Sequence, residues 1–250
     1  MLRPFIIALQ FLTRIPTPRL NELGEQEIGR SLAWYPLVGL LLGLLLATLG
    51  WFGRELPASL YAAVLLAVWV TLTGALHLDG LADSADAWLG GLGDREKTLE
   101  IMKDPYCGPA AVVTLVLVLL IKFTALEHLL TTENWEALVL APVLGRTTLV
   151  VLFLTTPYVR PNGLGSLLAN HLPRRACIIV ILFTLVAVPL FIGIAAFWLL
   201  LAAAGIFFAL RTLMLRRISG ATGDTAGALI EITETVMLLT AVLMNNVIHG

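Results

Sequence analysis

The sequence predicts an all-α integral membrane protein: a polytopic transmembrane helical bundle of about seven spans, with short interfacial helices on the cytoplasmic side. Two observations predict this class. Hydrophobic residues make up 58% of the 250 residues and charged residues only 13%, a balance that a soluble core of this length does not need. Several apolar stretches also reach the ~20 residues that a helix needs to cross the ~30 Å hydrocarbon core of a bilayer.

Five apolar stretches are long enough to cross a membrane once, and one further stretch is about twice as long. The five are residues 34–51, 60–78, 110–130, 137–156 and 226–247. The long stretch covers 176–215, and Pro189 and Gly193 near its middle favour a tight reversal, so it predicts two spans. The total is seven.

The whole chain, 1–250, is predicted to form a single membrane domain, because its loops are too short to fold independently and no repeat is present. Residues 1–30 are expected to be a cytoplasmic interfacial segment, since an apolar run too short to span is followed by Arg14 and two prolines. The two cysteines show no metal-like spacing, so neither a zinc site nor a disulfide framework is predicted.

Lysines and arginines outside the spans gather on one side of this topology. If the N-terminus is cytoplasmic, Arg54 is the only loop cation on the opposite side. Cytoplasmic loops are enriched in lysine and arginine. The sequence therefore predicts a cytoplasmic N-terminus.

Three aspartates follow the second span. Asp79, Asp83 and Asp86 have the spacing i, i+4 and i+7, which places them on one face of a helix. Like charges so close together need neutralisation, and Mg²⁺, or Mn²⁺, is the cation that carboxylates and substrate phosphates hold together. The plainer alternative is an acidic helix end facing the cytosol. His77 lies on the opposite side of this helix, where it either supports substrate binding or is a structural histidine.

Segment 79–108 is predicted to be the first cytoplasmic active-site segment. Glycines end its first helix, Asp94 is placed to cap a second short helix, and Pro105 stops that helix. Lys103 and Asp104 then lie at the mouth of the next span, suited to gripping phosphate and to accepting a proton.

Segment 216–231 is predicted to be the second cytoplasmic active-site segment. Asp224 lies between Thr222 and Thr225 at a helix N-terminus, which favours an anion. Glu231 is seven residues after Asp224 and shares its face, so it is a further candidate metal ligand. The alternative for this segment is a packing interface of small residues with helix caps.

Two cations fall inside predicted spans. Arg146 is a functional candidate because an arginine within the membrane is costly. Lys122 is the other cation inside a predicted span. The alternative for Arg146 and Lys122 is a structural role as counter-ions to glutamates such as Glu231 and Glu234. Arg14, at the membrane interface, is placed to cover the site or to bind lipid headgroups.

Together these motifs resemble the cobalamin synthase family, the adenosylcobinamide-GDP ribazoletransferases. The resemblance covers most of the chain, in order, and rests on FLTRIP at 11–16, WYPLVG at 34–39, GALHLDGLAD at 74–83, EIMKD at 100–104, GR at 145–146 and GATGDTAGALIE at 220–231. The segment around Cys107, where Pro-Tyr-Cys-Gly follows Lys103 and Asp104, is a departure from the family's pattern.

The resemblance implies that the protein joins adenosylcobinamide-GDP to α-ribazole or α-ribazole 5′-phosphate, releases GMP, and forms adenosylcobalamin or its 5′-phosphate. It also implies a Mg²⁺-dependent, multi-pass protein of the bacterial cytoplasmic (inner) membrane, with a cytoplasmic active site. The expected metal ligands are Asp79, Asp83, Asp86, Asp224 and Glu231. The expected catalytic residues are Asp104, Asp86 and Lys103, and the expected substrate-binding residues are Arg14, His77, Arg146, Thr222 and Thr225.

The expected partners are these small molecules and the lipid bilayer, with other cobalamin-assembly enzymes and a homo-oligomer left open and no nucleic acid. Two other functions are alternatives to this one. A CDP-alcohol phosphotransferase would use similar chemistry, but its signature has an Ala-Arg pair that is missing after Asp79. A cation- or proton-coupled transporter would place its carboxylates near the membrane midplane and show repeated halves.

Overall fold

The protein is a bundle of helices in the computed structural model, which describes residues 2–20 and 22–249. In chain order the helices are α1 (Leu2–Leu12), α2 (Glu25–Ser31), η1 (Leu32–Trp34), α3 (Tyr35–Phe52), α4 (Ala58–Thr73), α5 (Leu76–Gly90), α6 (Arg95–Ile101), α7 (Pro109–Thr131), α8 (Trp135–Thr155), α9 (Leu164–Asn170), α10 (Arg174–Ile192), α11 (Ala195–Ile218) and α12 (Gly223–His249). The described residues contain no strand, only an isolated bridge between Tyr158 and Ala221. The predicted all-α class is confirmed.

Six helical segments of the described chain are long and apolar enough to cross a membrane, and α4 with α5 makes a seventh if the pair counts as one broken span. The six are Glu25–Phe52, which joins α2, η1 and α3, followed by α7, α8, α10, α11 and α12. The reversal predicted within 176–215 is confirmed, because α10 ends at Ile192 and Gly193 has a φ of +62° before α11 begins. The protein is therefore a multi-pass membrane protein.

Helix α8 lies at the centre of the bundle, and 83% of its most apolar window is buried. Two glycines of α3 allow a close approach to it. A Cβ on Gly39 would lie 2.5 Å from the carbonyl oxygen of Pro142, and a Cβ on Gly43 would lie 2.6 Å from that of Val139. Small residues four positions apart allow membrane helices to pack with their backbones in contact.

The second apolar stretch departs from the prediction. Helix α4 ends at Thr73, and α5 then runs at 88° to it. Gly74 and Ala75 form the break, with left-handed φ values of +62° and +55°. A Cβ on Gly74 would also lie 2.2 Å from Nε of Arg14, so both the backbone conformation and the packing favour glycine here. The continuous span predicted over 60–78 is therefore wrong at its C-terminal end.

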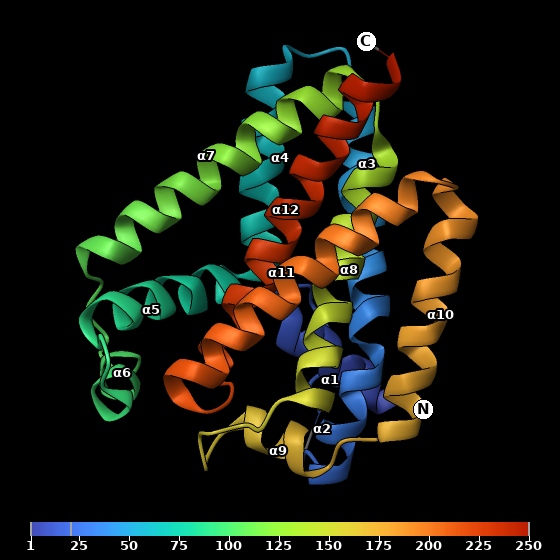
Figure 1. The fold of residues 1–250 in the computed structure, drawn as a ribbon. Coiled ribbons are helices and arrows are strands. Elements are labelled where there is room, and N and C mark those ends of the chain that lie inside the picture. Colours follow the sequence, from blue (N-terminus) through green and yellow to red (C-terminus); the bar gives the residue numbers. More distant parts are fainter. Residues whose placement is uncertain (1, 21, 250) are drawn as a thin grey trace.

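Figure 1 shows α5 lying across the bundle, whereas α3, α4 and α12 run along it. Helix α6 and the turn between α11 and α12 lie toward the end of the bundle that also holds α1, α2 and α9. The C-terminal part of α12 lies at the opposite end. The two segments predicted to form the active site thus lie on the side of the bundle where the chain begins.

Candidate active site

Helix α5 crosses α12 at two glycines. A Cβ on Gly80 would lie 2.7 Å from the carbonyl oxygen of Asp224, and a Cβ on Gly227 would lie 3.3 Å from Cα of His77. Because glycine has no Cβ, the two backbones can come this close. The crossing brings the aspartates of α5 beside Asp224, which lies in the first turn of α12.

The surroundings of Asp83 raise its pKa from 3.8 to about 6. Burial is the largest cause, the negative charges of Asp224, Asp79 and Asp86 add to it, and Arg160 acts in the opposite sense. Asp83 lies on α5, outside the helices that are long enough to cross a membrane. The structure therefore brings four aspartates from two distant segments into one electrostatic environment.

The donors of this aspartate group suit a hard divalent cation. Mg²⁺ and Mn²⁺ prefer carboxylate oxygens. The negative charges of Asp224, Asp79 and Asp86 all act on Asp83, and a cation among them would relieve this repulsion. As the side chains stand, no three or more His, Cys, Asp or Glu residues of the described chain form a ready set of metal ligands. Asp79 is exposed, and Asp224 is ion-paired to Arg160.

Asp86 has a structural task in this group. Its Oδ2 accepts a hydrogen bond from the Gly108 N–H at 2.6 Å, and its Oδ1 accepts one from the Ala111 N–H at 2.9 Å. These N–H groups belong to the start of α7, where a helix has no internal acceptors for them. Asp86, predicted as a metal ligand and catalytic residue, therefore caps α7 and fixes it to α5.

Lys103 and Asp104 follow α6 and border an open cleft of about 730 Å³ along that helix. The predicted cap of α6 is present, since Asp94 accepts a hydrogen bond from the Lys97 N–H at 3.1 Å. Asp104 is exposed, and its Oδ1 accepts the Tyr106 N–H at 3.0 Å. The pair is accessible to a solute from the water-facing side.

Thr222 and Thr225 bond to each other at the start of α12. The Thr222 N–H donates to Oγ1 of Thr225 at 2.9 Å, and the Thr225 N–H donates to Oγ1 of Thr222 at 3.2 Å. Both residues are buried, 0% and 1% exposed. Their hydroxyls, for which substrate binding stays a prediction, accept hydrogen bonds from N–H groups at the start of the helix and fix the position of Asp224 between them.

Arg160 lies among the aspartates, although no sequence motif marks it. Its Nη2 lies 2.7 Å from Oδ2 of Asp224 and donates to the carbonyl oxygen of Met102 at 3.1 Å. The loop between α8 and α9 that carries it is paired with the α11–α12 turn through the bridge between Tyr158 and Ala221. The signal in the sequence was a basic residue in a loop on the predicted cytoplasmic side, one of many there.

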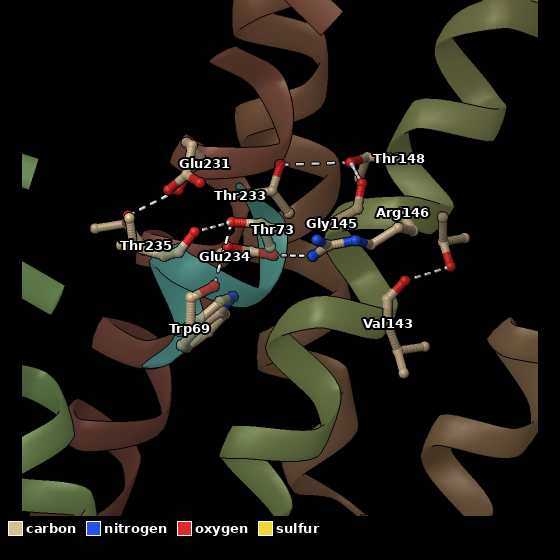
Figure 2. A network of polar contacts seen from close by, with 12 residues as sticks. Trp69, Thr73, Val143, Gly145, Arg146, Thr148, Glu231, Thr233, Glu234 and Thr235 are labelled. Carbon is tan, nitrogen blue, oxygen red and sulfur yellow. Dashed lines mark hydrogen bonds and ion pairs between the residues drawn. The ribbon is translucent and has the colours of Figure 1, made fainter. Parts of the chain in front are cut away.

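A second group of charged side chains lies inside the bundle. Nζ of Lys122, on α7, is 2.5 Å from Glu231 and 2.8 Å from Glu234, and Arg146 of α8 also pairs with Glu234. None of the four side chains is more than 4% exposed. Figure 2 shows Arg146 reaching from α8 to Glu234. Two carboxylates of α12 thus neutralise cations from two other helices.

Three of the predicted site residues are buried in this structure. His77 and Arg146 are 3% and 0% exposed and were predicted to bind substrate, and Glu231 was predicted to bind metal. These roles stay predictions, and in this structure Arg146 pairs with Glu234 and Glu231 pairs with Lys122. Both ring nitrogens of His77 lack a hydrogen-bond partner in the described chain. Arg14 is exposed, and its side chain packs over Gly74 where α5 begins.

The segments that build this site all lie within a match to a known family. The family model described as cobalamin-5-phosphate synthase matches residues 4–242. Adenosylcobinamide-GDP ribazoletransferase of Pseudomonas putida strain GB-1 is 57% identical over 236 residues, 94% of this chain and 97% of the relative. The protein of the same name from Pseudomonas fluorescens is 56% identical over 236 residues, which cover 94% of this chain and 97% of the relative. The one from Pseudomonas savastanoi pv. phaseolicola is 54% identical over 241 residues, which cover 96% of this chain and 99% of the relative. No solved structure matches the chain.

Proposed function

Because the chain belongs to the cobalamin-5-phosphate synthase family, we propose that it is an adenosylcobinamide-GDP ribazoletransferase. It joins adenosylcobinamide-GDP to α-ribazole or α-ribazole 5′-phosphate, releases GMP, and forms adenosylcobalamin or its 5′-phosphate. The observation that supports this most strongly is the nearly end-to-end similarity to proteins of that name. A CDP-alcohol phosphotransferase and a transporter have no comparable support.

The reaction replaces one bond to phosphorus by another. A hydroxyl oxygen of the ribazole forms a bond to the phosphorus that carries the cobinamide. The bond from that phosphorus to the oxygen of the GMP phosphate breaks, GMP leaves with the electron pair, and the hydroxyl proton passes to a base. Such a transfer needs groups that neutralise phosphate charge and align the hydroxyl with the phosphorus.

The aspartate group supplies the cation site in this proposal. Asp79, Asp83 and Asp224 would hold Mg²⁺, or Mn²⁺, with their carboxylate oxygens. A bound divalent cation neutralises phosphate charge that develops as the leaving group departs. Asp86 contributes indirectly, because it holds α7 against the helix that carries Asp79 and Asp83.

The cleft along α6 supplies the remaining groups. Lys103 would neutralise the phosphate of the departing GMP. Asp104, which is exposed at the cleft, suits the role of proton acceptor. The pH dependence of the rate in Asp104→Asn tests this role, since loss of the base removes the acidic limb of the profile.

We place the protein in the bacterial cytoplasmic (inner) membrane, with its N-terminus and active site on the cytoplasmic side. The distribution of loop lysines and arginines supports this orientation, since Arg54 is the lone loop cation assigned to the other side. The expected reaction fits the same side, where nucleotide-activated substrates are made. Accessibility of cysteines introduced at exposed loop positions to an impermeant reagent in intact cells tests the orientation.

The experiment that tests the function is release of GMP and formation of cobalamin by the detergent-purified protein. Adenosylcobinamide-GDP is supplied with α-ribazole or its 5′-phosphate, with Mg²⁺ or with a chelator. Product is expected with Mg²⁺, with a loss of at least ~100-fold in Asp83→Asn, the range typical of a lost electrostatic group in an active site. Glu55→Gln is the matched carboxylate-to-amide control, since Glu55 is exposed and paired with Arg54. Absence of product from folded wild-type protein with both ribazole forms would overturn the proposal.

A further inference from the structure

One loop arginine connects three segments of the aspartate site. Nη2 of Arg160 lies 2.7 Å from Oδ2 of Asp224 at the start of α12. The same Nη2 donates to the carbonyl oxygen of Met102, directly before Lys103 and Asp104, at 3.1 Å. The guanidinium therefore lies where the α8–α9 loop, the end of α6 and the start of α12 meet.

The backbone that presents Arg160 is held in place. The Val159 N–H donates to the carbonyl oxygen of Ala221 at 2.9 Å, and the Ala221 N–H donates to that of Pro157 at 2.8 Å. A Cβ on Gly220 would lie only 2.3 Å from the same Pro157 oxygen, so the α8–α9 loop and the α11–α12 turn are in close contact. Because these hydrogen bonds fix the backbone next to Arg160, its side chain has a defined position. This suits a residue that positions a ligand.

The guanidinium has a buried donor that the protein does not use. Nε of Arg160 is buried and lacks a hydrogen-bond partner in the described chain. Arginine carries five N–H donors in a planar fork, which matches the oxygens of a phosphate group. A buried donor without a partner costs free energy, and a bound oxyanion would remove that cost.

The charges around Arg160 give its guanidinium two alternative partners. It is the cation that opposes Asp224, Asp79 and Asp86 in their effect on Asp83. When a divalent cation neutralises these carboxylates, the attraction between Arg160 and Asp224 weakens, and an anionic ligand becomes the better partner. The nucleotide-activated substrate brings such an anion in its pyrophosphate.

We propose that Arg160 is a phosphate-binding residue of this site, paired with Asp224 in the free protein and with the pyrophosphate of the substrate in the complex. This inference rests on the proposed function. Arg160 distinguishes the two substrates, since it contacts the phosphorylated donor and has no contact with the phosphate-free nucleoside.

Separate titrations of each substrate test this role, because no turnover occurs when the other substrate is absent. The variants are Arg160→Ala and Arg160→Lys, with Arg211→Ala as the matched control. Arg211 also donates to backbone and hydroxyl oxygens of a neighbouring segment, at Thr155 and Thr156. Dissociation constants for adenosylcobinamide-GDP and for α-ribazole are measured by calorimetry in Mg²⁺, and melting temperatures are measured beside them.

Arg160→Ala is expected to weaken binding of adenosylcobinamide-GDP by roughly 10- to 100-fold, the range for a lost hydrogen bond to a charged group. Binding of α-ribazole and the melting temperature are expected to stay close to the wild-type values. Arg160→Lys is expected to bind the donor with intermediate affinity, because it keeps the charge without the fork. Arg211→Ala is expected to bind both substrates as the wild type does.

Two results would overturn the inference. One is unchanged donor affinity in Arg160→Ala. The other is an equal loss for both substrates together with a lower melting temperature in both Arg160 variants, which would make Arg160 a purely structural link. Wild-type protein that neither binds adenosylcobinamide-GDP nor releases GMP from it would instead overturn the proposed function, so the two failures are distinguishable.

Discussion

Nζ of Lys122 lies 2.5 Å from Oε2 of Glu231, although the two residues are 109 positions apart in the chain. The same Nζ is 2.8 Å from Glu234, which also pairs with Arg146. The two positive and two negative charges cancel, so the group as a whole is neutral inside the membrane. It fixes α7 and α8 to α12, the helix whose first turn carries Asp224.

Glu234→Ala is predicted to destabilise the protein strongly. The change leaves Arg146 without its carboxylate and removes one of two carboxylates from Lys122. Removal of one partner from a buried ion pair costs about 3–5 kcal/mol, which thermal unfolding in detergent would detect. Glu55→Ala, which breaks an exposed ion pair with Arg54, should leave the melting temperature nearly unchanged. Equal shifts for the two variants would contradict the role of the buried group.

Gly80→Ala is predicted to lower the rate of GMP release by at least about 10-fold, because small displacements of reacting groups reduce rates by up to ~100-fold. The added Cβ would lie 2.7 Å from the carbonyl oxygen of Asp224 and would push α5 away from α12. Gly205→Ala is the control, since a Cβ there meets no atom within 4 Å. The measurement is the initial rate of GMP release by both variants. A fully active Gly80→Ala would show that activity does not depend on the close contact between α5 and α12.

Asp83 predicts a pH dependence of stability. Its pKa is raised from 3.8 to about 6 in the folded protein, chiefly by burial and then by Asp224, Asp79 and Asp86, with Arg160 acting in the opposite sense. A carboxylate with a raised folded-state pKa binds its proton more tightly when folded. Its stabilising contribution is therefore complete below pH about 4 and is lost as the pH rises through about 6.

The corresponding measurement is the melting temperature of wild type and Asp83→Asn in a chelator, at about pH 5 and about pH 7.5. The variant cannot ionise at this position, so it should melt at a higher temperature than the wild type at the higher pH. The difference should shrink at the lower pH, where Asp83 of the folded wild type is mostly protonated. A variant that is the less stable protein at the higher pH would refute this account.

Two variants of Asp86 distinguish its role as a helix cap from a role in the reaction. Asp86→Ala removes both acceptors from the start of α7 and should cost about 1–2 kcal/mol, the range for a lost helix cap. Asp86→Asn keeps one oxygen acceptor and should retain most of the stability and activity. Stability and initial rates of the two variants are compared, and a folded but inactive Asp86→Asn would restore Asp86 to the catalytic group.

Features set by neighbouring residues could be predicted from the sequence. The break at Pro189 and Gly193 and the cap of α6 by Asp94 were predicted at the correct positions, because helix ends depend on residues within a turn or two. The break at Gly74 was missed, since Ala75, Leu76 and Leu78 continue the apolar stretch past it.

Features set by distant residues could not be predicted. Asp86 has the spacing of a metal ligand, but its oxygens bond to a helix that starts 22 residues later. Arg160 has no motif of its own, and only the pairing of its loop with the α11–α12 turn brings it to Asp224. The sequence predicted that Arg146 and Glu231 are costly in lipid and need partners, and the structure shows that Glu234 and Lys122 supply them.

The order of synthesis gives the buried ion pairs a further consequence. Lys122 and Arg146 leave the ribosome before either carboxylate of α12 exists, and Glu231 follows Lys122 by 109 residues. At ~5–20 residues per second this delay is about 5–20 s, during which the two cations in α7 and α8 lack the carboxylates of α12 and are costly in lipid. When α12 is made and inserted, Glu231 and Glu234 pair with the two cations. A nascent chain that stops short of α12 therefore displays uncompensated charge in the bilayer, a feature by which an incomplete product differs from a finished one.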